Sequence, residues 1–436
     1  MIARPAYLKK LIQARNNGFP KVITGIRRCG KSFLLKEIYR EYLLNDGVKD
    51  ENIIIIELDD IRNASYRNPF SLEKRVIDLC NPNKMNYVFI DEIQLVDRVI
   101  NPIYVEGKTV LAKDGDANAV SFVDLVLGLS RRKFIDLYVT GSNSKMLSSD
   151  IATEFRDKAT NIEVRPLSFE EFCDYKNDLS TETVFDFLQF GGMPLAVLKE
   201  EEERKAYLKG LFYTTYFKDI VERHRLAKSE ALDGLANALS CNCGQLLNAE
   251  RLARIYQSAT KQKASKDLIE NYIGYFVDAF LLQEAKRFDV KGNREIGALR
   301  KYYFIDNGLR NARLNFAFED EGQMLENLVY NELVQHGYTV NVGCFDKVEK
   351  NRERKSVKKT FEIDFLAKKG SREFYVQVSS DLGSEETRAR EVRPYLALGD
   401  QIQKIIVINK PIKATLTQDG FLVIGIVDFL MNFIKD

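Results

Sequence analysis

The sequence predicts an α/β protein whose N-terminal part is a doubly wound parallel sheet. Short runs rich in β-branched or other apolar residues, at 21–24, 53–57, 87–90 and 137–139, alternate with stretches of helical periodicity. Several of these runs end in acidic or small polar residues, at the edge where parallel sheets bind their ligands. The 436 residues are enough for about three domains. We therefore expect a ligand site at the carboxyl edge of the first sheet and further domains after it.

The composition excludes several classes of protein. Lysine and arginine total 65 against 63 acidic residues, which excludes a uniformly basic nucleic-acid coat but not a local basic patch. The two histidines exclude histidine-rich metal sites, and the six cysteines form no CxxC pair. No apolar run approaches the roughly 20 residues of a membrane span. We expect a cytoplasmic protein that does not engage a membrane.

The motif GxxxxGK[ST] follows the first apolar run and precedes a stretch of helical periodicity. Glycines in such a loop let backbone N–H groups surround phosphates at a helix N-terminus. Lys31 is expected to contact the β- and γ-phosphates, and the Ser32 hydroxyl to bind Mg²⁺. The sequence therefore predicts ATP and Mg²⁺ as cofactors of this loop, whose residues are Gly25, Ile26, Arg27, Arg28, Cys29, Gly30, Lys31 and Ser32.

The apolar run 87–90 leads directly into Asp91 and Glu92. Asp91 is expected in the Mg²⁺ shell, and Glu92 is placed to polarise the water that attacks the γ-phosphate. The run 137–139 ends near Ser142 and Asn143, either of which could sense the γ-phosphate. The sequence does not choose between the two, and either could instead cap the next helix.

These motifs, together with the segments 165–172 (RPLSFEEF) and 190–194 (FGGMP), resemble the bacterial and archaeal AAA-type ATPases. The resemblance spans residues 5 to 430, and it implies an ATPase domain followed by winged-helix and nuclease-like parts. Members of that family usually carry arginines just after the sensor helix, some of which could serve as fingers acting on a second copy. Here the resemblance points to Arg156, with Lys158 where a second arginine is common. A surface ion pair of Arg156 with Glu154 or Asp157 is the alternative.

The segment 230–305 has the pattern of helices followed by a hairpin with its turn at 291–294. Five basic residues between 251 and 266, with no acid among them, precede a helix with a clear apolar face. This order resembles a winged-helix module, which could dock on DNA through its basic residues. The alternative is a winged helix that contacts protein or spaces the domains.

The last segment resembles the restriction-endonuclease fold, in which a helix Glu, a strand Asp and a D/E/Q-x-K element bind Mg²⁺. Glu326, Asp364 and Gln377 match these positions, but Ser379 stands where the lysine belongs. The resemblance therefore implies a nuclease site that lacks its lysine, unless Lys368 or Lys369 substitutes in space. The loop 346–359 holds seven lysines or arginines against three acids and could follow a nucleic-acid backbone; a solvated loop is the alternative.

We expect three domains: an AAA-type ATPase at 1–200, a helical linker with a winged helix at 201–310, and a restriction-endonuclease-like domain at 311–436. The leading hypothesis is an enzyme that hydrolyses ATP through Lys31, Glu92 and Arg156 and engages a partner through its C-terminal half. The alternatives are a nucleotide-gated switch with little turnover and an ATP-controlled nuclease. The partners left open are DNA, another protein and a second copy of the chain.

Overall fold

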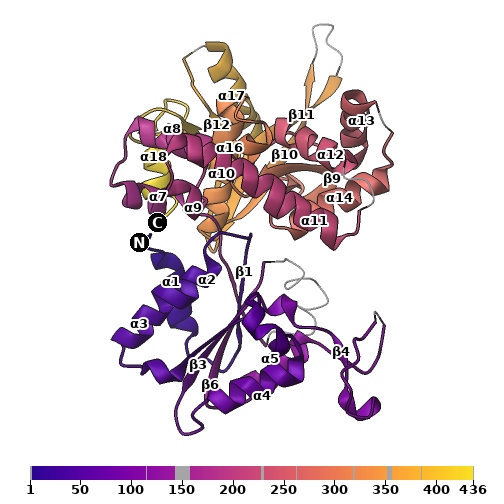
Figure 1. Cartoon of the computed structure of the whole chain (residues 1–436). Coiled ribbons are helices and arrows are strands. Elements are labelled where there is room, and N and C mark those ends of the chain that lie inside the picture. Colours follow the sequence, from indigo (N-terminus) through magenta and orange to yellow (C-terminus); the bar gives the residue numbers. More distant parts are fainter. Residues whose placement is uncertain are drawn as a thin grey trace. The chain divides into compact units, whose positions relative to one another are not determined.

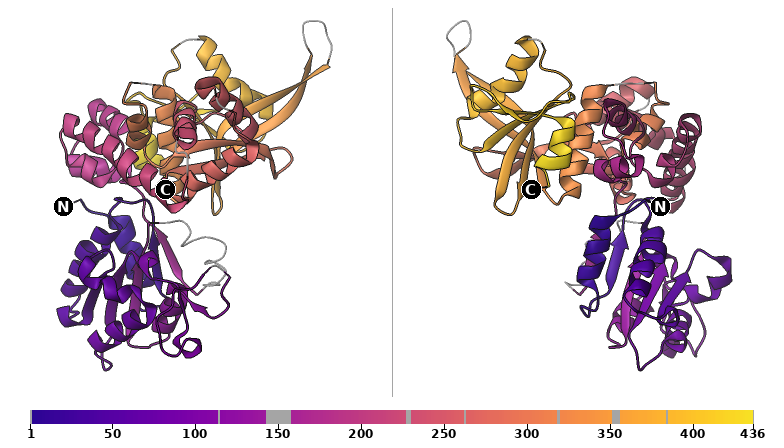
Figure 2. Two further views of the ribbon diagram at one scale, coloured as in Figure 1. Left: turned by 45° about the vertical axis from the view of Figure 1, so that its right-hand side comes forward. Right: turned by 90° about the vertical axis from the view of Figure 1, so that its left-hand side faces the viewer.

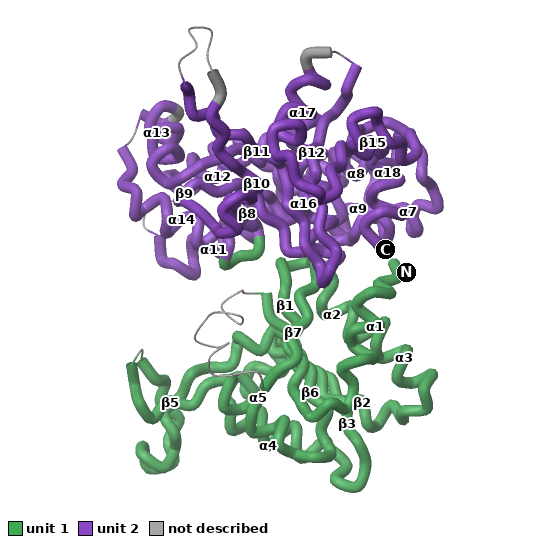
Figure 3. The backbone as a smooth tube through the Cα atoms, turned by 180° about the vertical axis from the view of Figure 1, so that it is seen from behind, with its two compact units in different colours: residues 1–165, 278–280 green, residues 166–277, 281–436 purple. Residues whose placement is uncertain are grey.

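The computed structural model describes residues 2–113, 115–142, 158–226, 230–261, 263–317, 320–350, 356–383 and 385–435. The chain forms two compact units, residues 1–165 with 278–280 and residues 166–277 with 281–436 (Figure 1, Figure 3). The border at 165 falls before the position near 200 that the sequence indicates. The division into three domains stays a prediction.

The first unit contains a parallel sheet with the strand order β2-β3-β6-β1-β7. Strands β1, β3 and β6 are buried along their whole length, as expected for strands covered on both faces. The order places β6 between β1 and β3, so the ends of these three strands are neighbours. The bounds are Lys21–Thr24 for β1, Ile53–Glu57 for β2, Asn86–Asp91 for β3, Ile135–Thr140 for β6 and Thr160–Glu163 for β7.

Helices cover both faces of this sheet, which confirms the doubly wound prediction. On one face, the ring of Tyr39 packs in tilted contact with those of Phe89 and Tyr138. On the other, Val88 and Val139 belong to a buried apolar cluster with residues of α4 and α5. The helices are α1 (Pro5–Ala14), a continuous helix through α2 (Lys31–Phe33), η1 (Leu34–Tyr39) and α3 (Arg40–Asn45), α4 (Pro69–Leu79) and α5 (Phe122–Ser130). The short strands β4 (Val99–Ile100) and β5 (Ala119–Val120) pair with each other, and the short helical turns are η2 (Asp50–Asn52), η3 (Ile61–Arg67), η4 (Ile93–Leu95) and η5 (Pro102–Tyr104).

The second unit begins with helices. The sequence order of helices followed by a hairpin recurs here as α12 to α14 and then β8 and β9, with the turn at 290–293. The helices up to that hairpin are α7 (Phe169–Lys176), α8 (Thr181–Phe190), α9 (Pro194–Val197), α10 (Glu201–Gly210), η7 (Leu211–Phe217), α11 (Lys218–Arg223), α12 (Glu230–Cys241), α13 (Ala249–Thr260) and α14 (Lys266–Asp278). Those after it are α15 (Asn307–Arg313), α16 (Glu321–Gln335), α17 (Glu385–Leu398), α18 (Ile426–Asp428) and η8 (Phe429–Phe433).

An eight-stranded mixed sheet forms the centre of this unit, in the order β14-β15-β13-β12-β11-β10-β8-β9. The hairpin that we expected to belong to a separate winged helix is the edge of this sheet, because β8 pairs in parallel with β10. The sheet therefore crosses the expected domain border at 310. The bounds are Leu282–Asp289 (β8), Arg294–Phe304 (β9), Thr339–Lys350 (β10), Ser356–Lys369 (β11), Arg372–Ser379 (β12), Gln403–Ile408 (β13), Thr415–Leu416 (β14) and Leu422–Gly425 (β15).

Strands β10 and β11 continue as an antiparallel two-stranded ribbon beyond the rest of their sheet (Figure 2). Their paired residues 346–348 and 356–360 are mostly exposed, whereas Phe345 and Phe361 at the base are buried. Among the described residues, no helix has the length and apolar character needed to cross a bilayer.

Candidate nucleotide site and carboxylate cluster

The GxxxxGK[ST] segment forms the turn between β1 and α2, and its backbone conformation requires glycine at Gly25. That residue has φ +137°, and an added Cβ would lie 2.0 Å from the Val164 carbonyl oxygen. Arg28 and Gly30 also have positive φ values, of 64° and 98°. Alternation of right- and left-handed residues turns successive N–H groups toward one side, which makes a concave anion-binding backbone. The loop therefore has the local geometry that phosphate binding needs.

Lys31 opens α2 and its buried side chain folds back over the loop. Its ammonium donates hydrogen bonds to the carbonyl oxygens of Gly25, at 2.9 Å, and Ile26, at 3.0 Å. These bonds hold the charge beside the concave backbone, where a phosphate would meet it.

The base of the loop is fastened from two directions. The Cys29 thiol donates to the Val164 carbonyl oxygen at 3.2 Å, and burial raises its pKa. The buried Arg4, just before α1, donates to the carbonyl oxygens of Cys29, at 3.2 Å, and Arg165, at 2.8 Å. Cys29 is thus a packed, protonated anchor of the loop and not an exposed nucleophile.

Asp91 ends β3 and meets the loop directly. Its Oδ1 accepts hydrogen bonds from the Ser32 hydroxyl, at 2.9 Å, and from the Thr140 hydroxyl. Its Oδ2 lies 3.4 Å from the Lys36 ammonium, which also pairs with Glu57. The two residues that we expected to bind Mg²⁺, Ser32 and Asp91, are therefore in contact.

Glu92 adopts a left-handed conformation, with φ 55° and ψ 49°. Its N–H donates to the Thr140 hydroxyl oxygen at 3.0 Å. Its carboxylate accepts from the Gln94 amide and from the Ser142 hydroxyl, the latter at 3.2 Å. Of the two sensor candidates, Ser142 thus contacts the expected general base. Asn143 and the finger candidate Arg156 lie outside the described residues.

Three further residues of the site, Thr140, Gln94 and Lys36, were not expected there from the sequence. Thr140 joins both acids because β6 lies between β1 and β3, and this strand order is not evident from a single sequence. Gln94 follows Glu92 by two residues, and Lys36 lies about one helical turn after Ser32. Their polar character beside the motifs was the only available signal.

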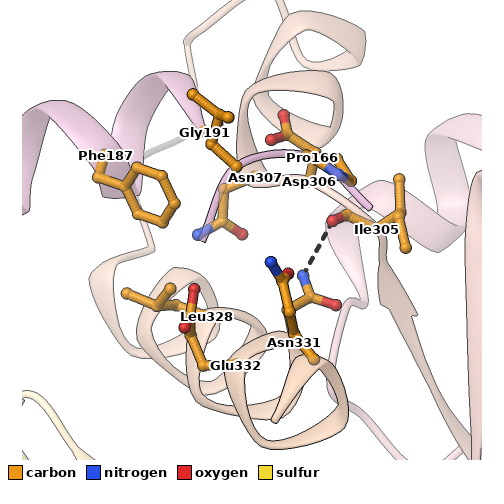
Figure 4. A pocket seen from close by; sticks show the side chains of 11 residues that line it. Pro166, Phe187, Gly191, Ile305, Asp306, Asn307, Leu328, Asn331 and Glu332 are labelled. Atoms are coloured by element: carbon orange, nitrogen blue, oxygen red, sulfur yellow. Dashed lines mark hydrogen bonds between the residues drawn. The ribbon is translucent and has the colours of Figure 1, made fainter. Parts of the chain in front are cut away.

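The segments 165–172 and 190–194, which carry much of the family resemblance, contact each other in the second unit. The N–H of Gly192 donates to Asp306 at 2.6 Å, and the N–H of Phe169 donates to Glu332 at 2.7 Å. They line a pocket together with Asn331, whose amide donates to the Ile305 carbonyl oxygen (Figure 4). The contacts indicate a structural role for these motifs in joining the helices of their unit.

The nuclease-like residues also lie together. The Lys301 ammonium, from β9, lies 2.8 Å from Glu326 on α16 and 2.9 Å and 3.3 Å from Glu362 and Asp364 on β11. The Gln377 side-chain oxygen accepts from the Asp364 N–H at 3.3 Å. Burial raises the pKa of Glu326, and Lys301 opposes that rise. Burial alone would lower the pKa of Lys301, but the three carboxylates outweigh it and raise the pKa well above its usual value.

Lys368 and Lys369, which the sequence left open as substitutes for the missing lysine, both have partners outside the cluster. Lys368 pairs with Glu373 at 2.7 Å, and Lys369 lies over the ring of Tyr338. The hydroxyl of Ser379 donates to the Asp381 carbonyl oxygen. The cation of the cluster is instead Lys301, more than 60 residues before Asp364 in the chain, where spacing from the nuclease motif gives no hint of it.

Comparison with known proteins supports the N-terminal assignment. Residues 17–173 match the model of an AAA domain, and residues 181–320 match a domain of unknown function. An uncharacterized protein of Haemophilus influenzae is 30% identical over 441 residues, which cover 99% of each chain. An uncharacterized protein of Methanocaldococcus jannaschii is 30% identical over 416 residues, covering 89% of this chain and 82% of the relative.

Among solved structures, the Aeropyrum pernix ORC2 protein in its ADP form aligns with 74% of this chain and 92% of its own. The sequence identity is 10% and the TM-score is 0.33, which is too low to relate the two chains as wholes. The expectation of an AAA domain is therefore confirmed by the family match, while the winged-helix and nuclease-like assignments stay predictions.

Proposed function

The chain belongs to the same family as the Haemophilus influenzae protein and carries an AAA domain, and on this basis we propose that it is an ATPase. The observation that carries the proposal is the set of hydrogen bonds joining the loop to both acids: Ser32 to Asp91, and Thr140 to Asp91 and Glu92. A phosphate-binding loop alone would serve many proteins. A loop coupled to two carboxylates at strand ends also supplies a ligand for Mg²⁺ and a base for the attacking water, both of which hydrolysis requires.

The residues present fit ATP and Mg²⁺. The loop from Gly25 to Ser32 presents backbone donors and the Lys31 ammonium, which suit phosphate oxygens. The Ser32 hydroxyl and the Asp91 carboxylate, 2.9 Å apart, are the oxygen donors that Mg²⁺ prefers. Bound Mg²⁺ would neutralise developing charge on the phosphate oxygens.

In this proposal Glu92 orients and deprotonates the attacking water. Its carboxylate is already held by Gln94 and Ser142, so its direction is fixed by two neighbours. Ser142 also lies two residues after the end of β6, where it could respond to loss of the γ-phosphate. Asn143 stays a second sensor candidate, and Arg156 stays a finger candidate that would require a second copy of the chain.

The test separates binding from turnover. Glu92→Gln keeps the shape of the side chain and removes the base, so phosphate release should fall at least 100-fold while the ATP dissociation constant stays within threefold. Lys31→Ala should instead abolish ATP binding. Wild-type protein that binds ATP tightly and releases no phosphate would support the nucleotide-gated switch in place of the ATPase.

A second proposal concerns the partner, which we propose to be double-stranded DNA bound by the ribbon of β10 and β11. Lys347 and Lys359 face each other across the ribbon, although like charges in that position repel. Val357, two residues before Lys359 and 46% exposed, adds apolar surface on the same face of the ribbon. A two-stranded ribbon fits the DNA major groove, and phosphates would relieve the repulsion between the lysines.

The basic residues of the winged-helix candidate are less favourable for binding DNA, because some of them already contact other groups of the chain. Of its five basic residues, Arg251 donates to the Leu246 carbonyl oxygen at 2.8 Å, and Lys266 lies 3.7 Å from Glu270. Both charges are thus partly used within their own elements. Arg254 and Lys263 are therefore the residues of this surface to replace when DNA binding is measured.

DNA binding is measured by fluorescence anisotropy on a duplex over a range of salt concentrations. Lys347→Gln/Lys359→Gln should weaken binding and reduce the salt slope by about 0.9 for each phosphate that the lysines no longer neutralise. Lys84→Gln/Lys133→Gln, on exposed residues of the first unit, is the matched control. It should change neither the DNA affinity nor the salt slope. If Arg254→Gln/Lys263→Gln alone weakens binding, the interface is the winged helix and not the ribbon.

A further inference from the structure

The cluster around Lys301 goes beyond the proposed ATPase, because it lies wholly within the second unit and shares no residue with the nucleotide site. Lys301 is only 3% exposed, and its ammonium contacts carboxylates from α16 and β11. Tyr303, two residues further along β9 and on the same face, donates its hydroxyl to Glu326 at 2.6 Å. One strand therefore delivers both a cation and a hydroxyl donor to the nuclease-like acids.

The resemblance to nucleases implies Mg²⁺ at Glu326 and Asp364, but the donor set does not fit a metal. Oδ1 of Asp364 lies 3.3 Å from Lys301, and Oδ2 accepts the Val378 N–H at 2.9 Å. Oε1 of Glu326 accepts from both Lys301 and Tyr303. Both oxygens of Asp364 and one of Glu326 are thus engaged by donors of the chain itself.

A divalent ion would also meet direct repulsion. Magnesium binds carboxylate oxygens at about 2.1 Å, and the Lys301 ammonium lies 2.8 Å to 3.3 Å from oxygens of the same carboxylates. Two cations sharing these oxygens would lie only a few ångströms apart in a buried setting. Among the residues that the structure describes, no group of three or more His, Cys, Asp or Glu is arranged to hold a metal ion.

We infer that Lys301 is a built-in cation that takes the place of the metal in the nuclease-like centre and ties β9 to α16 and β11. An ammonium has three N–H donors, and here three carboxylates surround it. Lys301 lies opposite Ala285 in the hairpin, and its ammonium contacts carboxylates of α16 and β11. Ser379 in the usual lysine position fits this arrangement, because the cation is supplied from another strand.

The inference is tested on the full-length chain by Mn²⁺ titration without nucleotide, with calorimetry and electron paramagnetic resonance as readouts. All samples carry Asp91→Asn so that the nucleotide site does not contribute. The Asp91→Asn protein, which keeps Lys301, should bind no Mn²⁺ at the cluster. Lys301→Ala should gain one Mn²⁺ per chain, and this gain should disappear when Asp364→Asn is added. Lys368→Ala, on a lysine paired outside the cluster, should gain none.

Two outcomes would overturn the inference. One is stoichiometric Mn²⁺ binding by the protein with Lys301 that Asp364→Asn abolishes. The other is a folded Lys301→Ala variant that binds no Mn²⁺. If Lys301→Ala does not fold, thermal unfolding of the Asp91→Asn protein decides. Saturating Mn²⁺ should leave its midpoint unchanged, and a rise that Asp364→Asn removes would contradict the inference. Loss of ATP hydrolysis affects none of these readouts.

Discussion

At the scale of single residues, Thr140 is the contact between the two acids of the nucleotide site. Its hydroxyl donates to Asp91 and accepts the Glu92 N–H, and the side chain is fully buried. A threonine at a strand end is ordinary in sequence. Its importance comes from the neighbours that the sheet order gives it.

Thr140→Val should therefore disturb both acids without changing the volume of the side chain. It leaves the partly buried Glu92 N–H without its acceptor, which costs about 1 kcal/mol of unfolding free energy. We expect the ATP turnover number to fall at least tenfold, with a smaller change in ATP affinity. Steady-state phosphate release and urea unfolding provide the measurements. Thr140→Ser keeps the hydroxyl and should retain most activity; equal losses in the two variants would contradict this role.

At the scale of elements, the strands and the loop of the first unit were predictable because their signals are local. Continuous apolar runs predicted β1, β2, β3 and β6, and the motif predicted the loop before α2. Lys301 was not predictable, because its partners lie on α16 and β11 and meet it only through strand pairing. The hairpin β8–β9 was predicted, but its membership of a larger sheet was not.

The start of α15 makes a prediction about pH. Asp306 caps this helix and accepts the Gly192 N–H, and burial raises its pKa to about 6. Because the folded chain holds this proton more tightly than the unfolded chain, the stabilisation is fully present below about pH 4. It is lost as the pH rises to about 6, by roughly 2–3 kcal/mol.

Asp306→Asn removes this titration. The unfolding free energy of wild type minus that of the variant should therefore decrease between pH 4 and pH 6 and stay constant above about pH 7. Urea unfolding at half-unit pH intervals measures the difference. If the unfolding free energies of wild type and variant differ by a constant amount between pH 4 and pH 6, Asp306 keeps an ordinary pKa.

At the scale of the whole molecule, each compact unit has its own sheet and its own apolar core. We expect calorimetry to resolve two unfolding transitions. Mg-ATP should raise the midpoint temperature of only one of them. At 100 times the dissociation constant, the ligand should add about 2.7 kcal/mol to the unit that binds it. Lys31→Ala should remove that shift. A single transition, or two that rise together, would contradict independent unfolding.

The sheet of the second unit has a consequence for the ancestry of the chain. Parallel pairing of β8 with β10 joins residues on either side of the end of the matched domain of unknown function, at residue 320. A recombination event at that border would remove β8 from beside β10. The backbone N–H and C=O groups of β10 that pair with β8 would then lack partners and could pair with another chain, which promotes aggregation. Because the second compact unit also includes residues 166–277, gene fusion or loss should move residues 166–436 together, whatever happens to the ATPase domain before them.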